Sequence, residues 1–138
     1  MKPTVTGILE TVLYVDDVGR ALAFYENLFC FKSLFATERA AGLDVAGRQV
    51  LLLFEKKSML EPAVSKRGTI PPHDGDGHLH MAFAIPADAL EAWEKRLAAR
   101  KIPVTARYQW PRGGQSLYFE DPDGHVIELV TPGCWKTY

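Results

Sequence analysis

Hydrophobic and polar residues follow one order of patterns twice along this chain. In the first half, a β-rich alternating run at 11–15 precedes a segment whose apolar residues recur with a helical period, among them Ala21, Phe24, Leu28 and Phe31. Asp16 and Asp17 offer this helix an N-cap. Further β-like runs follow at 33–37, 42–45 and 50–54. The first half therefore predicts a βαβββ module.

The second half repeats this order. A strand is predicted at 79–85, followed by a helix whose buried face carries Leu90, Trp93 and Leu97. Asp88 and Glu91 have the spacing of a capping box, and Glu91 with Lys95 has the spacing of an exposed ion pair. Strands are then predicted at 104–108, 115–120 and 125–130. The repeat predicts an α+β fold in which two βαβββ modules form a curved open sheet.

A stretch rich in proline and glycine joins the modules. We place module one at about 7–55, the joining segment at about 56–77 and module two at about 78–138, all within a single domain spanning 1–138. Loops of this length are uncommon and often functional. The segment is interpreted either as a lid or dimer contact, or as a mobile linker.

One carboxylate interrupts the last predicted strand. The turn Asp121-Pro-Asp-Gly-His125 leads into an apolar run that Glu128 breaks. A carboxylate on a half-buried strand is costly unless a cation, a hydrogen-bond network or a metal pairs with it. Glu128 is therefore the first candidate functional residue.

Side-chain parity adds two more candidates. Because side chains alternate along a strand, the large apolar residues of 79–85 share the helix-covered face, which leaves His80 on the other face. The same argument separates Glu10, Val12 and Tyr14 from the apolar set of the first strand. Glu10, His80 and Glu128 are thus metal-capable residues on the faces that the helices leave open.

Composition excludes several classes of function. The net charge is −1 without a basic block, so we expect neither nucleic acid nor an anionic membrane as a partner. No segment approaches the ~20 apolar residues of a membrane span, and no signal core is evident. Cys30 and Cys134 provide neither a disulfide framework nor zinc spacing. We expect a cytoplasmic protein.

Four motifs resemble those of the glyoxalase/bleomycin-resistance/extradiol-dioxygenase superfamily, also called vicinal oxygen chelate proteins. They are Glu10-Thr-Val-Leu-Tyr-Val-Asp-Asp17, Ala23-Phe-Tyr-Glu-Asn-Leu28, His78-Leu-His-Met-Ala-Phe-Ala-Ile85 and Tyr118-Phe-Glu-Asp-Pro-Asp-Gly-His-Val-Ile-Glu128. The resemblance covers nearly the whole chain, and the last motif is the most specific.

The resemblance implies a divalent metal held by residues on the first and last strands of each module. Carried over by position, the ligands are Glu10, His80 and Glu128, with Leu51 at a fourth position that is unable to bind metal. Three protein ligands leave positions for substrate or water. The metal is Zn, Ni, Mn, Mg or Fe; a single His with two carboxylates fits the Fe(II) site of dioxygenases poorly. Glu10 and Glu128 are also the candidate catalytic groups.

Several other residues are candidates for substrate binding, each with a plain structural alternative. Arg112, in the turn after Trp110, either clamps an anionic group or is a surface residue. Tyr14 and Tyr118 either line a pocket or pack with a polar tip in solvent, and Trp135 lines the site mouth or anchors the tail. We interpret His73, His78 and His125 as solvated loop or surface residues.

Two functions of different class remain. The first is a metal-dependent enzyme of glyoxalase type, a lyase or isomerase or an enzyme that opens epoxides, acting on a small vicinal-oxygen substrate. The second is a metal-free protein of bleomycin-resistance type that binds a drug or another small molecule. In this alternative the rings of Trp110, Tyr14, Tyr118 and Trp135 stack on an aromatic ligand. The resemblance also implies a homodimer.

Overall fold

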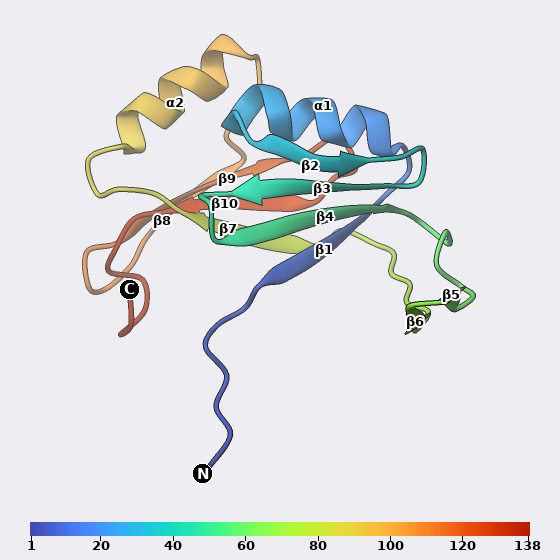
Figure 1. Cartoon of the computed structure of the whole chain (residues 1–138). Coiled ribbons are helices and arrows are strands. Elements are labelled where there is room, and N and C mark those ends of the chain that lie inside the picture. The colour runs from blue at the N-terminus through green and yellow to red at the C-terminus, as the bar shows by residue number, and fades with distance from the viewer. The chain divides into compact units, whose positions relative to one another are not determined.

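The computed structural model describes residues 1–138 and divides them into two compact units, Met1–Asp76 and Gly77–Tyr138. Each unit contains a four-stranded sheet with its own helix, and each is described separately below (Figure 1).

The first unit contains a mixed sheet whose first strand pairs with its last. Its elements are β1 (Glu10–Val15), α1 (Val18–Phe29), β2 (Lys32–Ala36), β3 (Ala40–Val45) and β4 (Gln49–Glu55). The strand order is β1-β4-β3-β2, and only the β1–β4 pair is parallel. The helix between β1 and β2 covers one face of this sheet (Figure 1).

Local signals account for the ends of α1. The side chain of Asp17 accepts a hydrogen bond from the backbone N–H of Arg20 at 2.9 Å, as an N-cap does. Cys30 ends the helix in the left-handed conformation, with φ of 59°. The helix begins directly after the predicted N-cap Asp17, and Tyr25, rather than the predicted Phe24 and Phe31, supplies its large buried ring.

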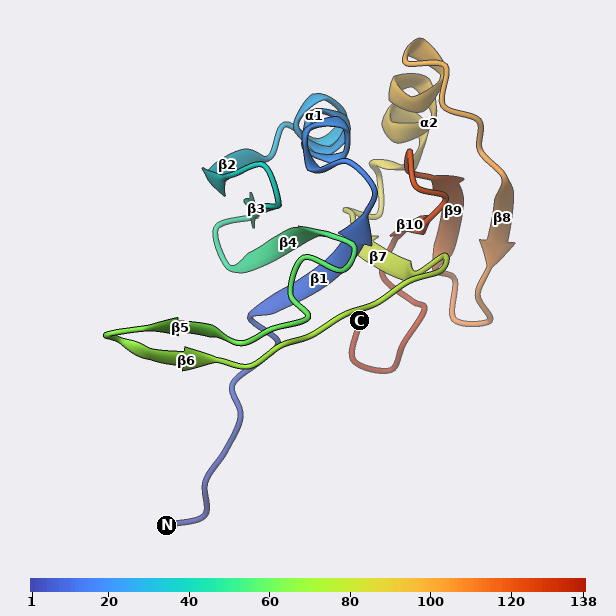
Figure 2. The ribbon, with the colours of Figure 1, turned by 90° about the vertical axis from the view of Figure 1, so that its right-hand side faces the viewer.

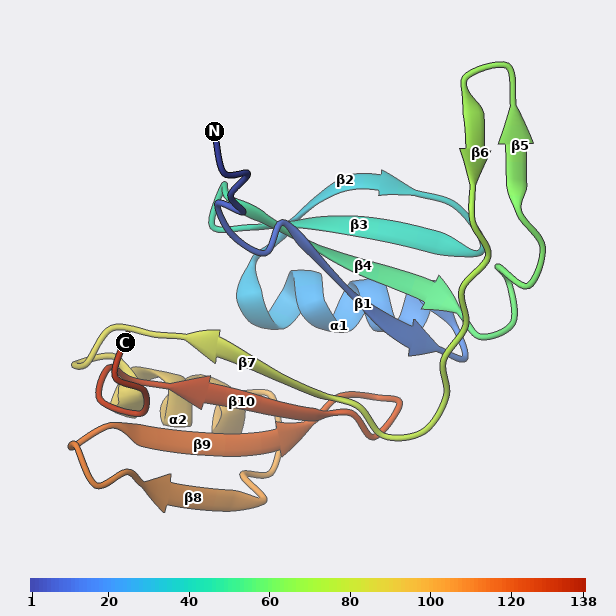
Figure 3. The same ribbon diagram turned by 90° about the horizontal axis from the view of Figure 1, so that it is seen from below.

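The segment predicted to be a linker contains regular structure. Two short strands, β5 (Ala63–Ser65) and β6 (Gly68–Ile70), form an antiparallel hairpin that projects from the first unit (Figure 3). The chain then returns to the sheet, where the hydroxyl of Tyr14 lies 2.7 Å from Nδ1 of His73. His73 also packs edge-on against Phe54, so it is a half-buried contact of this segment and not the solvated residue that was predicted.

The second unit repeats the topology of the first. Its elements are β7 (His80–Ala84), α2 (Leu90–Ala99), β8 (Ala106–Gln109), β9 (Gln115–Glu120) and β10 (Val126–Val130). The strand order is β7-β10-β9-β8, and the β7–β10 pair is parallel. Figure 2 shows α2 over one face of this sheet, where its residue Leu97 is buried.

The predicted capping box of α2 does not form. Ala89 occupies the N-cap in a helical conformation, and no side chain caps the first turn. The predicted exposed pair is present, with Lys95 Nζ 2.7 Å from Glu91 Oε1. Thus the helix gains support from a surface pair and from the buried Leu97, but not from Asp88.

The repeated βαβββ order confirms the predicted fold class. In both sheets, residues on the helix side are buried and apolar, including Leu13 and Leu53 in the first unit and Phe119 and Leu129 in the second. Neither helix has the length and apolar composition needed to cross a membrane.

Candidate metal and substrate site

Two of the predicted ligands lie side by side in the second unit. Nε2 of His80 is 3.1 Å from Oε2 of Glu128. The parallel register explains the contact, because Val126 pairs with His80 and Glu128 follows two residues later on the same face. The side chain of Glu128 is 8% exposed, whereas that of His80 is 53% exposed. Within the pair, Glu128 is therefore buried, whereas His80 faces solvent.

The second nitrogen of His80 fixes the orientation of its ring. Nδ1 lies 2.9 Å from the backbone oxygen of Val126, which accepts only, so Nδ1 carries a proton and donates it. In the neutral imidazole, Nε2 then has a lone pair and points at a carboxylate oxygen. Two acceptors at this distance repel each other unless a cation lies with them. The cation can be a proton on Nε2 or a metal ion.

The other oxygen of Glu128 is held by two neutral donors in series. The hydroxyl of Ser116 donates to Oε1 of Glu128 at 2.5 Å. The indole N–H of Trp110 donates to the oxygen of Ser116 at 2.8 Å. No Lys or Arg forms an ion pair with Glu128, so neutral donors and His80 balance this buried carboxylate.

The donor set fits a divalent metal. A ligating histidine commonly donates its other N–H to a backbone carbonyl, as His80 does to Val126. Two ligands about 2.1 Å from a metal are about 3.0 Å apart at right angles and about 3.4 Å apart at the tetrahedral angle. The 3.1 Å between Nε2 and Oε2 matches this range. Within either unit, no group of three His, Cys, Asp or Glu residues is arranged around a metal position.

Tyr118 borders the His80–Glu128 pair. It lies opposite Glu128 in the antiparallel β9–β10 ladder, and its ring centroid is 6.2 Å from that of His80. Burial raises the pKa of the Tyr118 phenol, and a hydrogen bond to Glu128 and the charge of that carboxylate raise it further, whereas a hydrogen bond with Ser116 lowers it. Tyr118 is therefore a neutral hydrogen-bond donor at the site.

An aromatic group adjoins Ser116. The Tyr108 and Trp110 rings meet at nearly a T-shape with centroids 4.7 Å apart, and Trp135 lies 6.4 Å from Trp110. Tyr108 is 53% exposed and Trp135 is 70% exposed, so a planar ligand can reach both. Arg112 is exposed in the turn between β8 and β9, and its predicted role in substrate binding stays a prediction.

The remaining predicted site residues belong to the first unit. Glu10 begins β1 and is exposed, and Tyr14, on the same face, holds His73. The fourth ligand position was predicted to be Leu51, which is wrong. Leu51 is buried on the helix side, and the register places Leu52 on the face that Glu10 shares. Leucine occupies the position in either case.

The histidine of the β9–β10 turn is structural. His125 was predicted to lie at the surface, but it is fully buried. Its Nδ1 accepts the backbone N–H of Leu79 at 2.9 Å, and the backbone N–H of His125 donates to the side chain of Asp121. His78 is exposed and its ring lies against Gly124, as expected for a rim residue. The conspicuous turn motif is thus held together by buried hydrogen bonds.

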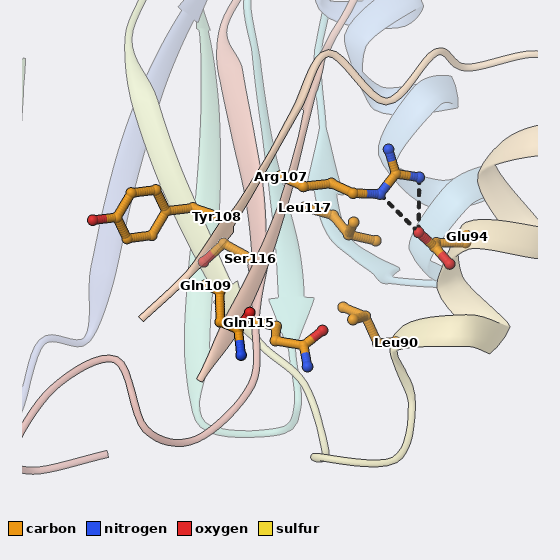
Figure 4. Close-up of a pocket in the computed structure, with 8 residues that line it drawn as sticks. All are labelled: Leu90, Glu94, Arg107, Tyr108, Gln109, Gln115, Ser116 and Leu117. Carbon is orange, nitrogen blue, oxygen red and sulfur yellow. Dashed lines mark hydrogen bonds and ion pairs between the residues drawn. The ribbon is translucent and has the colours of Figure 1, made fainter. Parts of the chain in front are cut away.

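A separate hollow of about 430 Å³ lies beside α2 and the β8 edge of the sheet (Figure 4). Arg107 points from β8 toward α2, where its guanidinium donates to Glu94 Oε1 at 3.0 and 2.8 Å. Tyr108 points the opposite way in Figure 4. The cation of β8 is therefore neutralised by the helix and turned away from the face that bears Glu128.

Ser116 was not predicted as a site residue. Its hydroxyl is the direct partner of Glu128, yet it was not among the candidates. Strand parity was a sufficient signal, because Ser116 and Tyr118 are two residues apart in one predicted strand and share a face. Trp110 was selected for stacking alone, although its N–H supports Ser116.

These features place the chain in a known class. It belongs to the Glyoxalase/Bleomycin resistance protein/Dioxygenase superfamily, whose family model matches residues 7–129. This confirms the resemblance drawn from the motifs.

Individual relatives include enzymes. The chain is 33% identical over 128 residues to the metallothiol transferase FosB of Bacillus licheniformis, covering 92% of this chain and 76% of that protein. It is 28% identical over 117 residues to the glutathione transferase FosA of Serratia marcescens, covering 85% and 74% respectively. A solved lactoylglutathione lyase from Agrobacterium tumefaciens has a TM-score of 0.87 and 32% identity, covering 98% of this chain and 99% of that one.

Proposed function

We propose that this protein is a divalent-metal-dependent enzyme that acts on a small substrate with vicinal oxygens. The observation that carries the proposal is the arrangement of His80. Its Nδ1 is committed to the Val126 carbonyl, so Nε2 and the Glu128 carboxylate offer two adjacent acceptors to one cation. The relatives support the same class, since FosB is named a metallothiol transferase.

His80 and Glu128 would hold the metal, and Glu10 stays the predicted third ligand. A bound divalent metal supplies Lewis-acid stabilisation of negative charge that develops on a substrate oxygen. Ser116 and Trp110 keep the Glu128 carboxylate in place. Tyr118 remains protonated beside the Glu128 carboxylate and borders the substrate, and a carboxylate such as Glu10 moves a proton.

The relatives support two alternative reaction types. Transfer of a thiol to an electrophile is one, from the FosB and FosA likeness, and lyase chemistry is another, from the lactoylglutathione lyase. A FosX variant of Listeria monocytogenes was solved with Mn(II) and a dihydroxypropylphosphonic acid, which supports Mn²⁺ as the first metal to test. Cytoplasmic location and a homodimer belong to the same proposal.

The decisive experiment is metal content. Wild type, His80→Ala and the matched control His78→Ala are purified without chelator, supplied with Mn²⁺, Ni²⁺ or Zn²⁺, and analysed by mass spectrometry for bound metal. We expect stoichiometric metal in wild type and His78→Ala and a loss in His80→Ala. No metal in wild type would overturn the proposal. Activity with fosfomycin plus thiols, and with hemithioacetals, then separates the reaction types.

A second function is favoured by the exposed aromatic group. Tyr108, Trp110 and Trp135 form a chain of ring contacts, and such rings stack on planar ligands. A metal-free binding protein would use them to sequester an aromatic drug. Quenching of Trp fluorescence by bleomycin-type compounds in the presence of a chelator, abolished by Trp135→Ala, is the result expected for this alternative.

A further inference from the structure

The carboxylate of Glu128 has two oxygens in different environments. Oε2 faces His80, whereas Oε1 accepts the hydroxyl of Ser116 at 2.5 Å. Ser116 is 2% exposed and Glu128 is 6% exposed, so water does not compete for this contact. The two oxygens of Glu128 therefore differ because different side chains contact each of them.

The direction of the Ser116 hydrogen bond is fixed by Trp110. An indole N–H is a donor only, and it lies 2.8 Å from the serine oxygen. Ser116 accepts this bond, and its single hydroxyl proton is left to donate to Glu128. Trp110, Ser116 and Glu128 thus form a one-way chain of hydrogen bonds that ends on Oε1.

We propose that Ser116, supported by Trp110, is a positioning residue that makes Glu128 a ligand through one oxygen. This inference rests on the proposed function. Because Ser116 holds Oε1 by a hydrogen bond, Oε2 is the oxygen that the carboxylate turns toward Nε2 of His80. A carboxylate that binds through one oxygen leaves an additional coordination position for the oxygens of a substrate.

The arrangement also limits the motion of the carboxylate. Rotation of Glu128 to bring both oxygens to a metal would break the Ser116 bond and leave a buried hydroxyl unsatisfied. Partners that orient metal ligands typically contribute 10–100-fold to metal affinity or activity. Ser116 therefore favours one geometry of its ligand without touching metal or substrate.

The test measures Mn²⁺ affinity by calorimetry and the Mn²⁺ EPR spectrum. The variants are Ser116→Ala, Ser116→Thr and Trp110→Phe, with Ser33→Ala as a control that removes a serine hydroxyl from the exposed strand β2. We expect Ser116→Ala to bind Mn²⁺ about 10–100-fold more weakly with a changed EPR spectrum. Ser116→Thr keeps a hydroxyl and restores the wild-type spectrum. Trp110→Phe has a smaller effect in the same direction.

Each possible outcome of these measurements supports or refutes the positioning role of Ser116. Wild-type affinity and spectrum in Ser116→Ala would overturn the positioning role while leaving the metal proposal intact. Absence of Mn²⁺ binding by wild type would overturn both. If Ser116→Ala does not fold, as judged by circular dichroism, Trp110→Phe decides instead, because it keeps an aromatic ring at this position and removes the N–H donor. An unchanged spectrum in Trp110→Phe then refutes the inference.

Discussion

Glu10 and His80 hold the same place in the two units. Each is the first residue of the first strand of its unit, and each pairs with a valine across a parallel ladder, Val50 for Glu10 and Val126 for His80. The backbone register alone therefore shows that the two residues occupy equivalent positions in the internal repeat. Leu52 in turn is the counterpart of Glu128, so the predicted ligands are unequally divided between the repeats.

The equivalence of Glu10 and His80 leads to a prediction about metal affinity. Glu10→Gln removes a charge without changing the size of the side chain, so it should weaken Mn²⁺ binding measured by calorimetry if Glu10 is a ligand. Thr11→Ser, one residue later on the other face, is the matched control and should leave affinity unchanged. Unaltered affinity in Glu10→Gln would remove Glu10 from the ligand set.

The phenol of Tyr118 should confer a pH dependence on stability. Burial is the main cause of its raised pKa, followed by the hydrogen bond to Glu128 and the charge of that carboxylate. Below about pH 10 the phenol is protonated in both states, and its contribution is fully present. As the pH rises from there through the folded-state pKa, the unfolded chain loses a proton that the folded chain keeps, so the free energy of unfolding falls. Tyr118→Phe should reduce this fall in alkaline urea titrations.

The charge of Glu128 should change the pH at which the phenol of Tyr118 titrates. The difference between phenolate absorbance curves of wild type and Tyr118→Phe isolates the Tyr118 transition. In a Glu128→Gln background that transition should move to lower pH, because the neighbouring negative charge is gone. A transition at the same pH in both backgrounds would show that the carboxylate has no influence on the phenol.

Two glycines allow the chain to approach itself closely at the end of the second sheet. A Cβ on Gly114 would lie 2.6 Å from the backbone carbonyl carbon of Gly133 and 2.7 Å from the amide nitrogen of Cys134. Backbone is unable to move aside as a flexible side chain does. Gly114→Ala should therefore lower the free energy of unfolding by about 1–3 kcal/mol, as overpacking does, in denaturant titrations. Gly7→Ala, with no atom within 4 Å, is the control and should have little effect.

The β5–β6 hairpin is the element we expect to mediate self-association. Val64 and Ile70 are 75% and 61% exposed, an unusual arrangement for apolar side chains on neighbouring strands. Light scattering should show a dimer for wild type and a shift toward monomer for Val64→Lys with Ile70→Lys. Thr69→Lys adds charge at a polar position of the hairpin and serves as the control. A monomeric wild type would show that the homodimer expected from the family resemblance is wrong for this chain.

Periodicity was sufficient to predict the order of elements. The apolar residues at helical spacing located both helices within a few residues, and alternation located the strands that carry Glu10, His80 and Glu128. Parity correctly placed the latter two on one face, since a strand has only two faces. The contact between His80 and Glu128 depended on the pairing of β7 with β10, which the repeat and the family resemblance together implied.

The errors arose where one residue of register or a buried hydrogen bond decided the outcome. The predicted position, Leu51, comes four residues after Gly47, as Glu128 comes four residues after Gly124. The first turn has one more residue before its strand pairs, however, and a shift of one residue reverses the face. His125 lies in a turn of surface composition, yet its imidazole is buried, with Nδ1 accepting the backbone N–H of Leu79. Leu79 is distant from His125 in sequence, so periodicity along one strand does not reveal this contact.

The pairing of first with last strand in each unit has a kinetic consequence. In each unit, a helix and two further strands separate the first strand from its parallel partner in the sequence. The β1–β4 and β7–β10 pairs therefore close the two sheets through contacts between residues distant in sequence. Since Glu128 lies on β10, the carboxylate meets His80 only when the second sheet closes. Competence to bind a cation should thus arise late in refolding, after α2 and the β8–β9 hairpin have formed.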